Sequence, residues 1–401
     1  RFVIRISIIR ENEITGYCKG FSYYLKFYRS GLNNHSAVYV LRIRIFLDMT
    51  SKIIGVGNYI PSETISNLFF GDHIFLNEEG DVLKDSNESI TKKLQKITGI
   101  EERRYAGSTQ VASDIGLIAA RSAIEDSGID PETLDYIIFA HNFGDVRFGT
   151  IQSDTVPSLA SRVKHALRIK NNFCVAYDVL FGCPGWIEGV IQANAFIRSG
   201  IAKRCLIIGA ETLSRVVDIH DRDSMIYADG AGAIILEAND SDDSGIKSHL
   251  SASYTLNEKD FLYFGKSYNN ESCPDTKYIK MDGRKIYEFA LSNVPTAMQK
   301  CLDDSGYSIK DLSKIIIHQA NEKMDEAIVE RFYQLYDMSV PPGIMPMVIS
   351  KLGNSSVATI PSLLTMILRD ELESHTIQKD DVILFASVGA GMNINALVYK
   401  F

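Results

Sequence analysis

The sequence has little that would tie it to a membrane or to a nucleic acid. None of its apolar runs reaches the roughly 18 residues that a membrane-spanning helix needs, and its beginning lacks the apolar block and small-residue cleavage site of a secretion signal. Lys and Arg number 42 against 50 Asp and Glu, so the formal net charge is -8 and no general basic field exists for a polyanion. These absences predict a cytoplasmic protein that binds neither membranes nor nucleic acid.

Cysteine is also sparse and irregularly spaced. The six cysteines, at positions 18, 174, 183, 205, 273 and 301, form no C-x-x-C pair. This spacing favours neither a zinc site nor a disulfide framework, and it is typical of a reducing compartment. We therefore expect no bound metal.

The length of 401 residues, with 45% hydrophobic and 23% charged residues, is more than one compact core usually holds and predicts two lobes of similar size. Residues 1–48 differ from the rest, because they carry eight Lys and Arg against three Asp and Glu, and the first methionine is Met49. We interpret 1–48 as an extension outside the native core, although a targeting or membrane-surface arm is the alternative. The expected lobes are 49–230 and 231–401.

From residue 49 onward, apolar strand-like runs alternate with helix-like stretches. Such alternation predicts an α/β fold with sheets covered on both faces, and the similar order in both halves hints at a duplication. Expected strands span 52–61, 135–142, 173–180, 204–211, 229–238, 314–319, 381–389 and 394–401. Expected helices span 111–128, 157–167, 183–199, 283–306, 321–335 and 354–372.

The stretch "FGCPGW" places Cys183 between Gly182 and Pro184, at the expected start of a helix. Glycine allows an unusual backbone path, and proline is favoured at a first helical position. Free amides and the helix dipole at such an end stabilise an anion, so we expect a lowered thiol pKa and an oxyanion-binding amide beside the sulfur. The alternative is a small buried hydrophobic residue without chemistry.

Two other stretches place polar side chains at the edges of strands and helices. His318 ends the strand-like run "IIIHQ", at the sheet edge where α/β proteins bind ligands. Asn354 follows Gly353 at an expected helix start. Taken singly, a structural histidine and an asparagine N-cap remain open alternatives.

Together these stretches resemble the β-ketoacyl-[acyl carrier protein] synthase III family of the thiolase superfamily. The resemblance rests on "FGCPGW", "DGAGA" (229–233), "HQAN" (318–321), "GNSSVATIP" (353–361) and the ending "GAGMNINALVYKF", in that order, from about residue 49 onward. It implies a thiolase-like fold, with two pseudo-duplicated lobes and mixed five-stranded sheets in an α-β-α-β-α arrangement.

The resemblance also implies an acyltransferase that performs a decarboxylating Claisen condensation. Cys183 would be acylated by an acyl thioester, and His318 and Asn354 would bind the malonyl thioester carbonyl as CO2 leaves. The amides of Cys183 and Ala390 would form the oxyanion hole. It further implies a homodimer, acyl carrier protein as partner, and no cofactor beyond the phosphopantetheine of the carrier or of coenzyme A.

Residues expected near the pantetheine depart from the family pattern. Arg222 matches an arginine near the coenzyme phosphates, Asn321 closes "HQAN", and Lys323 replaces an arginine. The tryptophan and arginine that stack on adenine in coenzyme A-primed members are replaced by Lys93 and Ile97. We therefore favour a carrier-bound acyl donor.

Two further stretches have expected roles. A basic set of Lys92, Lys93, Lys96, Arg103 and Arg104 is a candidate docking patch for the acidic carrier, with plain surface charge as the alternative. Residues 142–158 form an expected loop that in relatives shapes the acyl pocket of the dimer partner.

Three alternatives to fatty-acid initiation remain. One is a specialised ketosynthase of dialkylresorcinol or polyketide type that joins longer acyl chains. Another is an acyltransferase that forms no carbon–carbon bond, and a third is a non-catalytic partner subunit. Retention of Cys183, His318 and Asn354 argues against the last two.

Overall fold

The computed structural model describes the side chains of residues 49–269, 271 and 275–401. Before residue 49 it describes only the backbone of four strands, which form an antiparallel sheet in the order β1-β2-β3-β4. These strands are Arg5–Arg10, Glu13–Cys18, Phe21–Ser30 and Val38–Phe46. The interpretation of 1–48 as an extension stays a prediction, since it concerns residues outside the described side chains.

The first lobe is built on a five-stranded mixed sheet in the order β11-β8-β12-β13-β5. Its first three strands are parallel to one another, β13 pairs antiparallel with β12, and β5 pairs antiparallel with β13. Eight of the nine residues of β12 are buried, which fits its nearly continuous apolar sequence. The strands are β5 (Thr50–Tyr59), β8 (Tyr136–Ala140), β11 (Val175–Val179), β12 (Arg204–Thr212) and β13 (Asp229–Asn239).

The second lobe repeats this arrangement with four strands in the order β14-β19-β18-β17. As with β8 and β12, β17 and β18 are parallel and the following pairs are antiparallel. The strands are β14 (Gly245–Ser253), β17 (Leu312–Ile317), β18 (Val382–Gly389) and β19 (Asn393–Lys400).

Two expectations about the sheets need correction. Among the described residues the second sheet lacks the expected fifth strand, because the segment beside β17 contains Pro341 and Pro342, which cannot donate to a strand ladder. Two described groups of β17 donate to this segment: the Ile315 amide to the Ile344 carbonyl and the Lys314 ammonium to the Gly343 carbonyl. The expected lobe boundary at 230 and 231 falls inside β13, and the chain changes sheets between β13 and β14.

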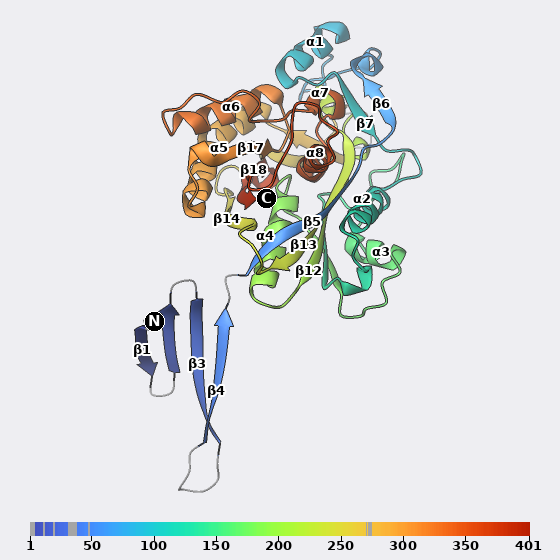
Figure 1. Cartoon of the computed structure of the whole chain (residues 1–401). Helices are drawn as coiled ribbons and strands as arrows, with labels where there is room; N and C mark the ends of the chain where they lie inside the picture. Colours follow the sequence, from blue (N-terminus) through green and yellow to red (C-terminus); the bar gives the residue numbers. More distant parts are fainter. Residues whose placement is uncertain are drawn as a thin grey trace.

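Helices cover both sheets and fill the space between them, which gives the expected layers (Figure 1). Helices α2 and α3 lie on the outer face of the first sheet, α4 and α8 lie between the sheets, and α5 and α6 cover the second sheet. These helices are α2 (Ala112–Ser127), α3 (Leu159–Ala166), α4 (Gly185–Arg198), α5 (Gly283–Ser305), α6 (Glu322–Gln334) and α8 (Thr359–Leu368).

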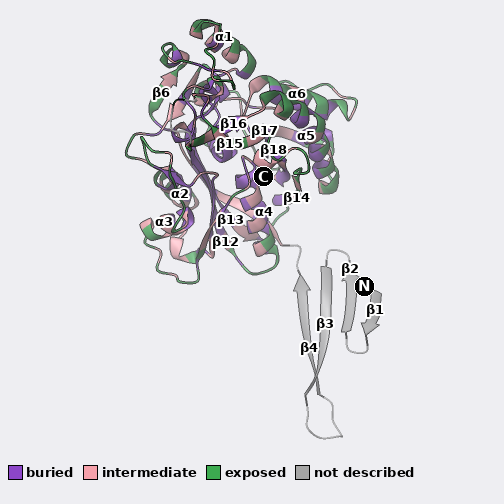
Figure 2. Cartoon of the chain, turned by 180° about the vertical axis from the view of Figure 1, so that it is seen from behind, coloured by how far each residue is buried: buried purple, intermediate pink, exposed green. Residues whose placement is uncertain are grey.

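The helices of the central layer lie in the largely buried interior of the described chain (Figure 2). Helix α4 buries residues on several sides, including Trp186, Ile187, Val190 and Ile197, as a helix enclosed by two sheets must. Each such apolar side chain stabilises the fold by about 1.5–3 kcal/mol. The inner helix ends are therefore held firmly against both sheets.

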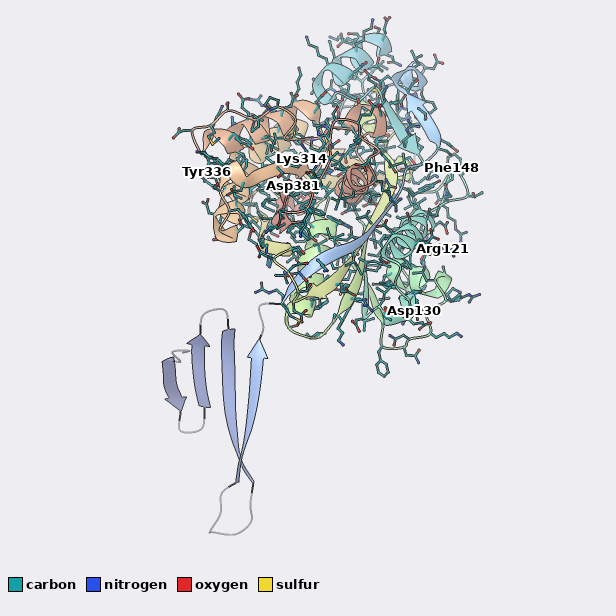
Figure 3. The ribbon with its side chains drawn as sticks, in the orientation of Figure 1. Arg121, Asp130, Phe148, Lys314, Tyr336 and Asp381 are labelled. Atoms are coloured by element: carbon teal, nitrogen blue, oxygen red, sulfur yellow. The ribbon has the colours of Figure 1, made fainter. Side chains whose placement is uncertain are left out.

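Shorter elements surround the rim of this core. Two short strands, β9 (Asp145–Val146) and β10 (Ser153–Asp154), pair within the expected loop at 142–158. Figure 3 shows Phe148 of this loop on the opposite flank of the molecule from Tyr336. The remaining elements are β6 (Glu63–Ser66), α1 (Asn87–Thr98), β7 (Glu102–Tyr105), β15 (Leu262–Lys266), β16 (Lys277–Met281) and α7 (Ile349–Leu352).

Candidate active site

Cys183 lies in the tight turn between β11 and α4. Gly182 takes the left-handed backbone conformation with φ of 67°, which favours glycine. The helix begins at Gly185, so Pro184 precedes it as the N-cap instead of occupying the expected first helical position. Cys183 therefore sits just before the free amides of α4.

This turn packs directly against the backbone that follows β18. A Cβ added to Gly182 would lie 2.7 Å from the Ala390 nitrogen, and one added to Gly389 would lie 2.4 Å from the Cys183 nitrogen. Only glycine leaves room for such contact. The two lobes thus bring the amides of Cys183 and Ala390 together.

His318 follows β17 and is buried. Its Nδ1 lies 2.7 Å from the Thr359 hydroxyl oxygen, whereas its Nε2 has no hydrogen-bond partner among the residues that the structure describes. Burial lowers the pKa of this imidazole to about 4, so the ring is neutral at pH 7.

Two backbone hydrogen bonds and one hydrogen bond to its side-chain oxygen fix the position of Asn354. Its N–H donates to the Ile226 carbonyl, and its carbonyl accepts from the Ala228 amide. The side-chain Oδ1 accepts from the Ser356 N–H at 2.8 Å, which leaves the NH2 group free to donate elsewhere. The expected helix at 354–372 begins only at Thr359, so Asn354 does not cap it.

One cavity of about 260 Å³ joins these groups. Cys183, His318, Asn354 and Ala390 all line it, although they come from both lobes. A thiol, an imidazole nitrogen and an amide NH2 therefore share one compartment. Most of the remaining wall is apolar and includes Phe143, Leu213, Leu262, Phe264, Ile279, Met281, Ile286, Val388 and Met392.

The expected lowering of the Cys183 thiol pKa is wrong. Burial raises the pKa of this thiol to about 11, and the nearby Glu211 charge raises it further, while the Ser356 hydroxyl and the cysteine's own amide lower it. The amides at the helix end do lower the thiol pKa, as expected, but burial of the thiolate away from water raises this pKa by more.

A polar network beside the thiol was missed by the sequence analysis. The backbone N–H and the side-chain Nδ2 of Asn142 both donate to Glu211 Oε1 at 2.6 Å, and Nδ2 also lies 3.1 Å from Ser356 Oγ. Burial raises the pKa of Glu211 to about 7. The only sequence signal was an acidic residue ending an otherwise apolar strand, where buried carboxylates are rare.

A second cavity of about 820 Å³ adjoins the first and forms its mouth. The two share Tyr227, Met281, Ile286, Ala320, Met324 and Asn354. Arg222 and Asn321 line this mouth, as do Lys93 and Ile97. Asn321 also caps α6 by accepting from the Met324 amide, whereas the exposed Lys323 lines neither cavity.

The candidate docking patch is smaller than expected. Arg103 is fully buried, and its guanidinium donates to the Met225 and Ile65 carbonyls and to Asn67 Oδ1. It holds strand ends together and cannot face a partner. Lys92 and Lys93 remain at the surface, although each forms an ion pair with a nearby carboxylate.

Within the described part of the chain, no helix is long and apolar enough to cross a membrane, and no three or more His, Cys, Asp or Glu side chains converge as metal ligands would.

Two mixed sheets around buried helices, with a cysteine at the entrance to one of those helices, define a thiolase-type acyltransferase. A family model described as 3-oxoacyl-[acyl-carrier-protein (ACP)] synthase III matches residues 177–253, and the model of its C-terminal part matches residues 302–401. A β-ketoacyl-[acyl-carrier-protein] synthase III of Staphylococcus haemolyticus is 31% identical over 354 residues, which cover 88% of this chain and 99% of that protein.

Solved structures have a similar fold. The 3-oxoacyl-[acyl-carrier-protein] synthase III from Aquifex aeolicus is 28% identical with a TM-score of 0.71, over 88% of this chain and 100% of that one. The priming β-ketosynthase of the R1128 polyketide pathway shares the fold, at 23% identity and a TM-score of 0.72, over 88% of this chain and 96% of that one. This chain belongs to the β-ketoacyl-[acyl-carrier-protein] synthase III family of the thiolase superfamily, which confirms the resemblance.

The raised thiol pKa predicts how Cys183 reacts with an alkylating agent. Iodoacetamide should modify it slowly at pH 7, and the rate should keep rising with pH to at least pH 9, because a thiol with a pKa of about 11 is mostly protonated in this range. Mass spectrometry of the modified peptide measures this rate, and Cys183→Ala gives the background from other cysteines. A rate that levels off near pH 7 would contradict the buried-thiol assignment.

Proposed function

We propose that this enzyme joins an acyl thioester to a malonyl thioester by decarboxylating condensation, in the initiation of fatty-acid synthesis. The observation that carries the proposal is that Cys183, His318 and Asn354, contributed by different lobes, line one largely apolar cavity. These are the side chains that an acyl acceptor and two neutral hydrogen-bond donors would require.

In the first step the Cys183 sulfur attacks the acyl thioester carbonyl. The oxyanion of the tetrahedral intermediate binds the amides of Cys183 and Ala390, whose turns are in contact. The carbon–sulfur bond of the donor then breaks, and the donor leaves as a free thiol that takes the proton of Cys183. The product is an acyl-cysteine.

In the second step the malonyl thioester enters through the mouth. Loss of CO2 leaves an electron pair delocalised into an enolate, whose oxygen accepts hydrogen bonds from His318 and from the Asn354 NH2 group. The enolate carbon attacks the acyl-cysteine carbonyl, the cysteine sulfur leaves and is reprotonated, and a β-ketoacyl thioester results. A neutral imidazole and an amide serve this step because neither adds a negative charge beside the enolate.

We propose a carrier-bound acyl donor over coenzyme A. The mouth carries more negative than positive side chains among the described residues. Each of its three cations already faces a carboxylate: Lys93 pairs with Asp85 at 2.7 Å, Arg222 lies 3.9 Å from Asp223, and Arg284 pairs with Glu288 at 2.9 Å. Coenzyme A would bring a nucleotide with several phosphates into this field, which disfavours it, whereas a carrier protein would bring only its phosphopantetheine arm. The acidic residues of the mouth are Glu78, Glu79, Asp85, Asp221, Asp223 and Asp282.

A specialised ketosynthase that joins longer acyl chains is the second candidate. The favouring observation is the apolar wall of a cavity of about 260 Å³, which is more space than an acetyl group fills. Such enzymes differ from the first candidate in the length of the acyl chains that they join.

The assignment of Cys183 to the acylation step and of His318 to the decarboxylation step can be tested directly. Incubation with a panel of acyl thioesters should add the acyl mass to the wild-type and His318→Ala proteins and not to Cys183→Ala, since only the sulfur carries the acyl group. His318→Ala should slow CO2 release from a malonyl thioester about 100-fold, because one enolate donor is lost. Intact-mass spectrometry and radiolabelled CO2 release measure the two steps.

The length of the acyl chains that become attached to Cys183 distinguishes an enzyme of fatty-acid initiation from a ketosynthase that joins longer acyl chains. Acylation of Cys183→Ala at the wild-type rate would rule out the nucleophile, and equal loss of both steps in His318→Ala would rule out the assigned role of the histidine.

Donor choice follows from the charge of the mouth. At low salt, Cys183 should be acylated at least about 10-fold faster by an acyl-pantetheine thioester than by the same acyl-coenzyme A, and salt should reduce this difference in rate. Glu78→Lys should speed acylation by acyl-coenzyme A only, whereas Glu373→Lys, which changes the charge equally but lies outside the mouth, should not. Equal rates for the coenzyme A and pantetheine thioesters in wild-type protein would exclude the donor proposal.

We also propose a homodimer formed along β11. This strand is the edge of the first sheet, and apolar side chains beside it are exposed, with Phe173 at 89% and Leu180 at 65%. An unprotected edge with apolar neighbours is typical of a strand that pairs with another chain. Sedimentation at micromolar concentration should give twice the chain mass, and a stable monomer would refute this interface.

A further inference from the structure

The position of a single proton on His318 decides whether this residue can bind an enolate. The neutral imidazole carries one N–H, on either Nδ1 or Nε2. Nε2 is buried without a partner among the described residues, and the ring lines the catalytic cavity. Only the form with the proton on Nε2 presents a donor to that cavity, because the other form presents a lone pair.

The partner of Nδ1 controls this choice. The Thr359 hydroxyl oxygen lies 2.7 Å from Nδ1 and 3.0 Å from the carbonyl oxygen of Ser356. The single proton of this hydroxyl can be donated to only one of these two atoms at a time. If the hydroxyl donates to the Ser356 carbonyl, Nδ1 must donate its proton to the hydroxyl oxygen, and Nε2 then carries no proton. If the hydroxyl donates to Nδ1 instead, the ring proton is on Nε2.

Two observations favour donation to Nδ1. The contact with Nδ1 is the shorter one, and the Ser356 carbonyl already accepts from the Thr359 backbone N–H, so this carbonyl keeps a partner when the hydroxyl donates to Nδ1 instead. The neighbouring Asn354 is held the same way, with its oxygen accepting from the Ser356 amide and its NH2 group free. Both side chains then present donors.

We propose that Thr359 is a positioning residue whose hydroxyl donates to His318 Nδ1 and thereby keeps the ring proton on Nε2, where it can bind the enolate oxygen. This inference rests on the proposed function. It assigns a role to the hydroxyl in the decarboxylation step alone, since Thr359 contacts neither the sulfur nor the two amides of the acylation step in the described structure.

Nitrogen-15 spectroscopy of the wild-type enzyme tests the proton position directly. With labelled histidine, and with His318→Gln to assign the signals, Nε2 should give the signal of a protonated ring nitrogen and Nδ1 that of a bare one accepting a hydrogen bond. The reverse pattern, with the proton on Nδ1, would overturn the proposal.

Kinetics provide the second readout. Thr359→Val keeps the side-chain shape without the hydroxyl, and it should slow CO2 release from a malonyl thioester about 10- to 100-fold while Cys183 acylation changes less than about 3-fold. Thr359→Ser should restore the release rate. Thr365→Val is the matched control, because Thr365 is also buried in α8 and its hydroxyl donates only to the Pro361 carbonyl.

The outcomes separate this inference from the proposed function. Unchanged CO2 release in Thr359→Val, together with a large loss in His318→Ala, would reject the role of Thr359 and leave the condensation intact. Unchanged release in His318→Ala would reject the function itself. Equal losses in Thr359→Val and Thr365→Val would show general damage to α8 and would also overturn the proposal.

Discussion

The contact between two backbone turns, one before α4 and one after β18, is the constraint on which the site depends. Neither Gly182 nor Gly389 has space for a Cβ, since a side chain there would strike the nitrogen of Ala390 or of Cys183. Each turn belongs to a different lobe, so the amides of Cys183 and Ala390 meet only when the lobes are fully packed. The buried helices between the sheets supply that packing.

Burial then determines the electrostatics of the cavity. The thiol, with a pKa of about 11, and the imidazole, with a pKa of about 4, are both neutral at pH 7. The negative charge in the proposed reaction therefore develops on substrate oxygens, where hydrogen-bond donors are worth more because water is excluded. Glu211, with a pKa of about 7, is partly charged at pH 7, and two N–H groups of Asn142 stabilise its charged form.

The sequence predicted those structural features that a local residue pattern determines. Apolar runs and helix-like stretches gave the layers. Cys183, His318 and Asn354 became candidates because each follows a strand or a glycine at an element boundary and because their motifs together resemble one family. The thiol pKa could not be predicted, because it depends on cover from the second lobe. The burial of Arg103 could not be predicted either, since one of its acceptors, the Met225 carbonyl, lies 122 residues away. The missing fifth strand was foreseeable from Pro341 and Pro342.

The largest local departure from the sequence prediction, the delayed start of α8, is the feature that the chemistry uses. The expected helix does not begin at residue 354. Instead a turn intervenes, with Ser356 at a φ of 53° that is unfavourable for a residue with a side chain. In this conformation the Ser356 amide orients Asn354, and its carbonyl lies beside the hydroxyl that bonds His318. The backbone strain at one residue thus positions both donors of the proposed enolate site.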